Sequence, residues 1–293
     1  MGDNRTKREA ELALIRDVAA KCKTAVITGP AGARWLGLST LGWVTRVDLA
    51  LPGNARTWGK AYPDRIYRGG VIRPEEYCVY QGLRTATAVR AIFDSYRYYG
   101  RMEALAQLES ARWQHPKLTA EYLLEQTTLL PQAKGLRHFR ELIGFSADTS
   151  ESVLETIVRD RLLRAIADGH LRGVQSIEFQ VGFKIEDAHG APTVAWADAL
   201  INGFIVVEAD GAEKSSGTAA QVANAIDVER FREKQLQNLG GVFYRVGWEQ
   251  ARGDAFIGRL QRLIDAHPGA RHMDNRLTET RREWLDGLRQ RFA

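Results

Sequence analysis

Three carboxylates lie in the apolar stretch TVAWADALINGFIVVEADG, residues 193–211. Asp198 belongs to the first strand-like run, and Glu208 and Asp210 belong to the second, where a spacing of two places both on one face of a strand. A carboxylate among Val and Ile is costly to desolvate unless it is paired, hydrogen-bonded or bound to a cation. Metal ligation is one interpretation, and strand-end carboxylates satisfied by backbone amides are the other.

The Asn-Gly turn at residues 202–203 decides whether the two runs bring their carboxylates to the same face. A two-residue hairpin would pair Asp198 with Val207 and place it on the face opposite to Glu208. A three-residue loop with a bulge would instead pair Asp198 with Glu208 directly. The sequence leaves both registers open.

The elements around this hairpin are expected to form one α/β unit. Their order is a helix at 150–169, a strand at 176–185, the two runs of the hairpin, a helix at 219–240, a strand at 241–248 and a helix at 255–267. The N-terminal half alternates helical and strand-like segments and is expected to be α+β. A polar break at residues 146–150 predicts the domain boundary. We therefore expect domains at 1–145 and 150–268, followed by an amphipathic helix at 274–293 whose buried stripe is Leu277, Trp284, Leu288 and Phe292.

The composition is that of a folded, soluble protein: 293 residues, 44% hydrophobic and 26% charged. No apolar run approaches the length of a membrane span, and the chain opens polar without a signal-peptide pattern, so a cytoplasmic protein without a membrane partner is expected. Cys22 and Cys78 form no CxxC pair, and the histidines have no metal-ligand spacing. A net charge of +5 is compatible with a polyanionic partner.

Basic and aromatic residues interleave in the segment 83–113, which the pattern predicts to be helical. Such residues can hold nucleic acid by phosphate contact and stacking, or they can pack and be solvated as an ordinary amphipathic helix. The residues concerned are Arg84, Arg90, Arg97, Arg101, Phe93, Tyr96, Tyr98 and Tyr99.

The order αβββαβ, with acidic residues on the first helix and on the second and third strands, resembles the core of PD-(D/E)XK nucleases. The segments SVLETIVRDRLL, VVEADG, DVERFREKQL and GGVFYRVGW together resemble the Vsr-like endonuclease domain at the C-terminus of actinobacterial AbiEi-type antitoxin proteins. In the first half, AVITGPAGARWLGL and LRTATAVRAIFDSYR resemble segments of the same family. The resemblance covers about residues 24–250, and it implies a restriction-endonuclease-like fold for the second domain.

The resemblance also implies a set of site residues. Glu155, Asp198 and Glu208 match the acidic cluster, with Asp198 and Glu208 as the metal ligands. Gln180 matches a neighbouring polar residue. The remaining matches are Asp210 and Lys214 in the strand-end motif, Asp227 and Arg230 on the following helix, and Arg245 on the last strand. Gln180, Arg230 and Arg245 are accordingly expected to bind substrate, and Glu155, Asp198, Glu208, Asp210 and Lys214 to act in catalysis.

These residues favour a DNA-acting protein, an endonuclease or nickase that hydrolyses phosphodiester bonds with Mg²⁺ or Mn²⁺. Phage defence or a toxin–antitoxin pair, with a cognate toxin as partner, would be its setting. Asp210 stands where the superfamily carries lysine, and Lys214 or Lys184 could replace that lysine. The alternative is a non-catalytic DNA-binding regulator or antitoxin that uses a degenerate nuclease fold.

Overall fold

The computed structural model describes residues 4–53, 62–211 and 219–291. The protein is mixed α/β, with about 48% helix and 21% strand, which confirms the fold class predicted from the sequence. It divides into two compact units, Met1–Val153 and Leu154–Ala293, a few residues after the polar break at 146–150. No helix in the described part of the chain is both long and apolar enough to cross a membrane.

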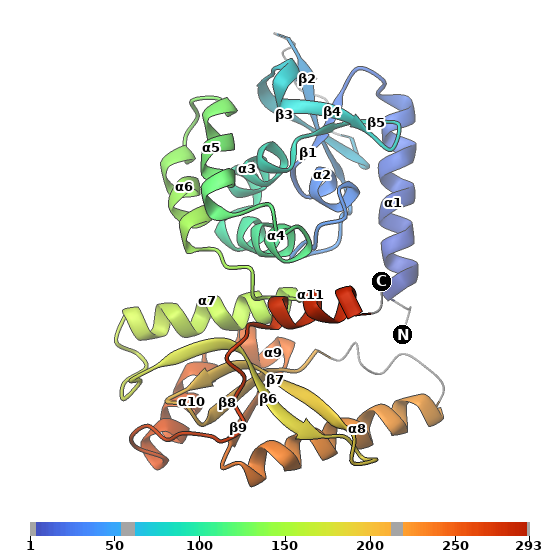
Figure 1. Cartoon of the computed structure of the whole chain (residues 1–293). Helices are drawn as coiled ribbons and strands as arrows, with labels where there is room; N and C mark the ends of the chain where they lie inside the picture. Colours follow the sequence, from blue (N-terminus) through green and yellow to red (C-terminus); the bar gives the residue numbers. More distant parts are fainter. Residues whose placement is uncertain (1–3, 54–61, 212–218, 292–293) are drawn as a thin grey trace. The chain divides into compact units, whose positions relative to one another are not determined.

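The first unit is built on a mixed five-stranded sheet in the order β3-β2-β1-β5-β4. The β1–β2 and β4–β5 pairs are antiparallel, and the β1–β5 and β2–β3 pairs are parallel. Its elements are α1 (Asn4–Lys21), β1 (Val26–Thr28), α2 (Gly29–Trp35), β2 (Val47–Pro52), β3 (Arg65–Ile72), η1 (Pro74–Glu76), β4 (Tyr77–Tyr80), β5 (Leu83–Ala86), α3 (Ala88–Tyr99), α4 (Arg101–Gln114), α5 (Ala120–Gln126), η2 (Thr127–Leu129) and α6 (Leu136–Phe145) (Figure 1).

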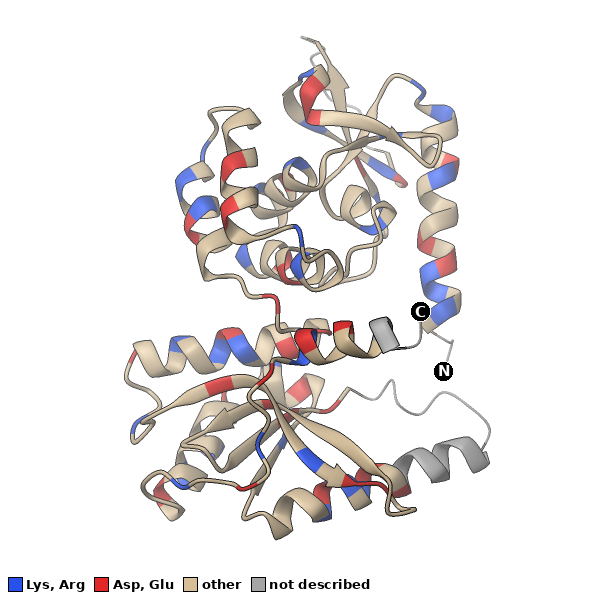
Figure 2. Ribbon diagram, viewed as in Figure 1, with Lys and Arg blue, Asp and Glu red and all other residues tan. Residues whose placement is uncertain are grey.

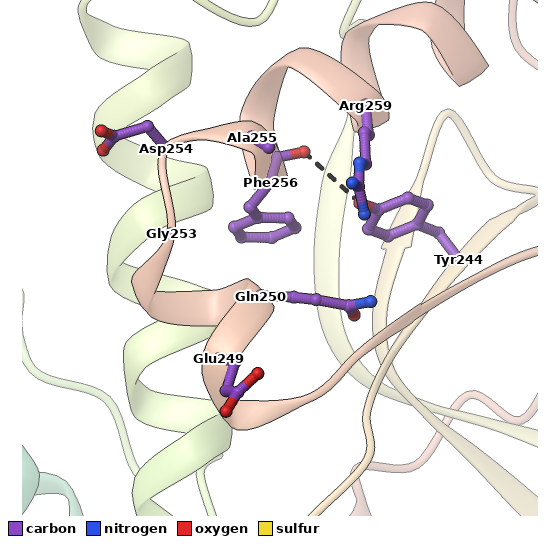
Figure 3. Close-up of a pocket in the computed structure, with 8 residues that line it drawn as sticks. All are labelled: Tyr244, Glu249, Gln250, Gly253, Asp254, Ala255, Phe256 and Arg259. Atoms are coloured by element: carbon purple, nitrogen blue, oxygen red, sulfur yellow. Dashed lines mark hydrogen bonds between the residues drawn. The ribbon is translucent and has the colours of Figure 1, made fainter.

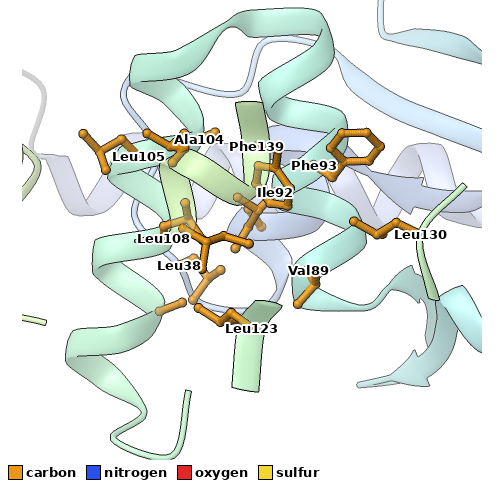
Figure 4. Close-up of a cluster of buried hydrophobic side chains, with 14 of the residues drawn as sticks. Leu38, Val89, Ile92, Phe93, Ala104, Leu105, Leu108, Leu123, Leu130 and Phe139 are labelled. Carbon is orange, nitrogen blue, oxygen red and sulfur yellow. The ribbon is translucent and has the colours of Figure 1, made fainter. Parts of the chain in front are cut away.

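The largest apolar cluster of this unit lies between its helices (Figure 4). Val89, Ile92 and Phe93 are at helical spacing on α3, so they form one buried stripe. The rings of Phe93 and Phe139 pack with centroids 5.2 Å apart and join α3 to α6. Burying side chains of this size contributes about 2 kcal/mol each, so this cluster contributes strongly to the stability of the unit.

The segment 83–113 is not one helix, as the sequence suggested. Residues Leu83–Ala86 form β5, and the helical part is divided into α3 and α4. The Thr87 hydroxyl accepts a hydrogen bond from the Arg90 amide and caps α3, so the helix begins at Ala88. Gly100 has a φ of 94°, a left-handed conformation that interrupts helix geometry between α3 and α4.

This division changes the expected roles of the arginines. Arg84 is exposed, but it lies on β5 rather than on a helix. Arg90 is 2% exposed and forms ion pairs with Glu76 and Asp94. The expectation that Arg90 could contact phosphate is therefore wrong, because its donors are already satisfied inside the unit.

The second unit follows the predicted order of helix, three-stranded meander, helix, strand and helix. Its sheet has the order β6-β7-β8-β9, with β6–β7 and β7–β8 antiparallel and β8–β9 parallel. Its elements are α7 (Val153–Ala167), β6 (Ile177–Glu186), β7 (Pro192–Ile201), β8 (Ile205–Ala209), α8 (Ala219–Asn238), β9 (Val242–Val246), α9 (Trp248–Arg252), α10 (Ala255–Ala266) and α11 (Arg281–Arg291) (Figure 1). Only the short α9 was not expected.

Helices contact both faces of this sheet. Arg232 of α8 donates to the backbone carbonyl of Trp196 on β7 at 2.8 Å, and Trp284 of α11 packs edge-on against the Trp196 ring. On β9, Phe256 of α10 stacks on Tyr244, with ring centroids 6.0 Å apart.

Residues 275–291, which we call the C-terminal arm, pack on β6 and belong to the second unit. The Lys184 amide donates to the Asn275 carbonyl at 2.8 Å, and the Leu277 amide donates to the Gly182 carbonyl at 2.8 Å. Of the predicted buried stripe, Leu277 precedes α11 rather than lying on it, Trp284 packs as expected, and Phe292 is outside the described residues. The arm therefore adds a pairing to β6 before it turns into α11.

Candidate functional site

The hairpin between β7 and β8 adopts the register that brings its carboxylates together. Ile201 pairs with Ile205 across a three-residue loop, and Ala199 pairs with Val207. Continuing this register by one residue places Asp198 opposite Glu208, with both side chains on the same face. The structure thus contains the three-residue alternative rather than the two-residue hairpin.

The same register extends across the whole sheet. Glu208 pairs with Arg245 of β9. On the other side, Phe179 pairs with Ala199 and Val181 with Ala197, so Gln180 lies opposite Asp198. These pairings define a row across four strands, the carboxylate row, which consists of Gln180, Asp198, Glu208 and Arg245.

Gln180 has an unusual backbone conformation for a residue inside a strand. Its φ is 52°, in the left-handed region that costs a side chain-bearing residue about 1 kcal/mol or more. Its side-chain amide donates to Glu155 Oε2 at 3.0 Å and to Asp198 Oδ1 at 3.4 Å. Gln180 therefore joins Glu155, at the start of α7, to the carboxylate row.

Asp198 is held by the strand that follows it. Its Oδ2 accepts a hydrogen bond from the Ala209 amide at 2.8 Å, next to Glu208 in the chain. This contact fulfils the second interpretation of the sequence, in which backbone amides satisfy a strand carboxylate. It also fixes the orientation of the carboxylate toward Glu208.

Glu208 is an acid of the row whose pKa is strongly raised. It is 5% exposed, and burial, followed by repulsion from Asp198, raises its pKa to about 8 in spite of the opposing effect of Arg232. Its Oε2 accepts a hydrogen bond from Arg232 at 3.1 Å. Its Oε1 is buried without a hydrogen-bond partner among the described residues. A buried oxygen of this kind is suited to a proton or a cation as its partner.

Arg232, the basic side chain that binds Glu208, was not identified from the sequence. Burial acts to lower its pKa, but Glu208 and Glu229 together raise that pKa above the usual arginine value. The resemblance selected Arg230, which is exposed, as is Asp227. Two residues correspond to about 200° around a helix, so Arg230 and Arg232 project from nearly opposite sides. The spacing of Arg232 from Glu229 and from buried Leu236 is the signal that could have found it.

The other predicted residues have different positions. Arg245 is paired with Asp210, Glu229 and Glu233 at 3.3, 3.2 and 2.7 Å. Burial opposes the charge of Arg245, and these acids raise its pKa overall. Asp210 is thus neutralised by Arg245 at the end of β8 instead of joining the buried carboxylates. Lys214 is outside the described residues, and Lys184 is exposed on β6.

The donor set fits a hard cation held by two carboxylates. By the continued register Asp198 and Glu208 lie on the same face of adjacent strands, Asp198 raises the pKa of Glu208, and Oε1 of Glu208 has no partner among the described residues. Mg²⁺ commonly binds through one or two carboxylates and keeps several waters. The described residues contain no group of three or more His, Cys, Asp or Glu side chains arranged to hold a metal. Waters and substrate oxygens would therefore have to supply the other positions.

A pocket of about 240 Å³ lies elsewhere in this unit, between β9 and the α9–α10 corner (Figure 3). Tyr244 and Phe256 form its aromatic part, and the Tyr244 hydroxyl donates to the Phe256 carbonyl at 3.5 Å. Tyr244 and Arg245 are consecutive on β9, so their side chains project to opposite faces of the sheet. The pocket is thus separate from the carboxylate row.

The chain was compared with protein-family models, curated proteins and solved structures, and none of them matches it.

Proposed function

We propose that the second unit is a Mg²⁺- or Mn²⁺-dependent phosphodiester hydrolase that acts on DNA as an endonuclease or nickase. The observation that carries this proposal is Glu208, which has a buried, unpartnered oxygen among the described residues and a pKa raised in part by Asp198, on the same face of the adjacent strand by the continued register. The order α7-β6-β7-β8-α8-β9 and the resemblance to Vsr-like domains of AbiEi-type antitoxins support it. Phage defence, or a toxin–antitoxin pair with a cognate toxin, is the setting that this resemblance suggests.

Each residue of the site has a role in this proposal. Asp198 and Glu208 would hold the cation, which when bound polarises a phosphate oxygen and lowers the pKa of a coordinated water. The Ala209 amide fixes Asp198, and Arg232 fixes Glu208 through Oε2, leaving Oε1 for the cation. Glu155 lies one hydrogen-bonded amide away from Asp198, as an outer carboxylate that can accept a proton from water.

One observation favours a second function, DNA binding without cleavage. Asp210 stands in the usual lysine position and is paired with Arg245, so neither supplies a free cation to a scissile phosphate. The Nη atoms of Arg232 donate to Glu208, Glu229 and the Trp196 carbonyl, so they too are engaged. A fold with these pairings could bind DNA as a regulator or antitoxin without hydrolysing it.

The two functions are separated by cleavage and binding assays on the same proteins. Plasmid nicking in Mg²⁺ and in Mn²⁺ is compared for wild type, Asp198→Asn and Glu208→Gln, beside duplex retardation without metal. The matched control is Asp168→Asn, which removes a carboxylate from an exposed position just after α7. If the protein is a hydrolase, nicking falls by orders of magnitude in both site variants and persists in the control, because only the two site variants remove cation ligands.

Retardation should survive in all variants, because phosphate contacts do not depend on these carboxylates. Cleavage that continues equally in Asp198→Asn and Glu208→Gln would assign the activity to a contaminant and end the hydrolase proposal. Retardation without any nicking in wild type would support the non-catalytic function instead.

A further inference from the structure

The C-terminal arm contacts the carboxylate row through Arg281. Its guanidinium donates to Gln180 Oε1 at 2.7 Å. Gln180 in turn donates to Glu155 and Asp198 through Nε2. A chain of hydrogen bonds therefore runs from α11 through one carboxamide to two carboxylates.

These partners allow the carboxamide of Gln180 only one orientation. Arginine has donors and no acceptor, and ionised carboxylates have acceptors and no donor. Turning the amide over would place its amino group against Arg281 and its oxygen against Glu155 and Asp198. All three contacts would then be repulsive, so Arg281 fixes which end of Gln180 faces the acids.

The position of Arg281 is itself determined by the arm. The Thr280 amide and hydroxyl donate to Glu283 Oε2 at 2.7 and 2.9 Å, and the Glu283 amide donates back to the Thr280 hydroxyl at 3.3 Å. This capping box starts α11 at Arg281. Before it, Arg276 forms an ion pair with Glu178 on β6, two residues from Gln180. The start of α11 and the pairing of the arm with β6 together place the Arg281 guanidinium next to Gln180.

The amino group of Gln180 lies against Asp198, one of the two carboxylates that would hold the cation. It bridges one oxygen of Glu155 and one of Asp198, whereas a carbonyl oxygen in the same place would be a hard ligand of the kind Mg²⁺ prefers. The strained φ of Gln180 indicates that the surrounding contacts hold this residue against its backbone preference.

We propose that Arg281 is a positioning residue through which the docked C-terminal arm keeps the Gln180 amino group between Glu155 and Asp198 and so weakens cation binding at the carboxylate row. Release of the arm lets the carboxamide turn its oxygen toward a cation that the acids hold, and this strengthens cation binding. The cation part of this inference rests on the proposed hydrolase function, and the orientation of the amide does not.

The orientation is tested without metal on the full-length protein. The side-chain amide signals of Gln180, assigned by their loss in Gln180→Ala, are followed by NMR in wild type, Arg281→Ala and Arg281→Lys. Loss of the guanidinium should shift these signals and speed their hydrogen exchange, and lysine, which keeps charge and a donor, should restore them in large part. Signals that are unchanged in Arg281→Ala would overturn the positioning role.

The effect on the cation is tested by Mn²⁺ calorimetry in a double-mutant cycle of Arg281→Ala and Gln180→Ala. Arg281→Ala should tighten Mn²⁺ binding about five-fold, the equivalent of one net hydrogen bond, when Gln180 is present. It should have no effect in the Gln180→Ala background. Equal tightening in both backgrounds would mean that removal of a positive charge acts alone, and the inference would be wrong.

The two readouts keep this inference separate from the proposed function. If wild type and all variants fail to bind Mn²⁺, the hydrolase proposal and the cation part of the inference fail together. The NMR comparison still decides in that case whether Arg281 positions the amide.

Discussion

At the scale of single residues, the site depends on Glu208, a buried acid that keeps its proton to a higher pH than an ordinary glutamate does. An ordinary glutamate has a pKa near 4.3, whereas that of Glu208 is raised to about 8 by burial and by Asp198. Between these two pH values the folded protein holds a proton that the unfolded chain releases. The free energy of unfolding must therefore fall as pH rises through this window.

Replacing Glu208 tests this linkage. In metal-free buffer the unfolding free energy of wild type should decrease from pH 5 to pH 8, by at most about 1.4 kcal/mol per pH unit from this group. Glu208→Gln cannot ionise, so its decrease over the same range should be smaller. Urea unfolding at several pH values measures both. The control is Glu249→Gln, at an exposed position, and a slope in Glu208→Gln identical to wild type would contradict the assignment.

The sequence predicted those residues of the site whose relation is local. Asp198 and Glu208 are joined by a short hairpin, so only the length of one turn remained open. Arg232 was missed because the helix was matched by resemblance rather than by which face meets the sheet. Arg281 was missed for a stronger reason. Its contact with Gln180 spans 101 residues, and no spacing rule connects an arginine on a terminal helix to a strand so distant in sequence.

At the scale of elements, the β7–β8 loop determines whether the site exists, because a slip of one residue would turn Asp198 away from Glu208. Buried Asn202 accepts hydrogen bonds from the Gln175 and Ser176 amides and donates to the Gly173 carbonyl. Gly203 follows it with a φ of 77°, and a Cβ there would lie 2.2 Å from the Arg271 carbonyl oxygen. The loop is thus held from two sides, a constraint that the Asn-Gly dipeptide alone did not reveal.

Two glycine substitutions, Gly190 in the β6–β7 loop and Gly203 in the β7–β8 loop, separate strain from close packing. Gly190 and Gly203 have nearly equal φ values, 78° and 77°, but a Cβ at Gly190 would meet nothing within 4 Å. Gly190→Ala should lower the unfolding free energy by about 1 kcal/mol through left-handed strain alone. Gly203→Ala should lower it by about 2–4 kcal/mol, because overpacking against the Arg271 carbonyl is added. Urea unfolding decides, and equal losses in the two variants would remove the packing argument.

The boundaries of β5 and α3 show where the sequence pattern failed to predict the secondary structure. The segment 83–113 has helical periodicity in its longer part, which hid the strand at Leu83–Ala86. That strand pairs with its neighbour β4 across a tight turn and with β1, which is distant in sequence. Tertiary pairing of this kind overrides local propensity.

At the scale of the whole molecule, positive charge is distributed unequally between the units. Residues Met1–Val153 contain 22 Lys and Arg against 16 Asp and Glu, whereas Leu154–Ala293 contain 19 against 20. In Figure 2 basic and acidic positions are interspersed along both α1 and α7. The unit with the carboxylate row has no excess of positive charge, so the proposed binding of DNA needs phosphate contacts from the first unit.

This division predicts which arginines control the salt dependence of DNA binding. Arg46 and Arg84 are exposed in the first unit, and Arg172 and Arg262 are exposed in the second. In metal-free buffer, duplex affinity of the full chain should fall with salt on a log–log scale, with a slope of about 0.9 per phosphate contact. Changing Arg46 and Arg84 together to Gln should reduce that slope by about 1 to 2, because binding releases fewer counterions when each of these phosphate contacts is lost. Changing Arg172 and Arg262 to Gln removes the same charge and should leave the slope nearly unchanged.

Equal reductions in the two double variants would show that DNA contacts both units alike. An affinity of wild type that does not depend on salt would argue against both the hydrolase and the non-catalytic DNA-binding function.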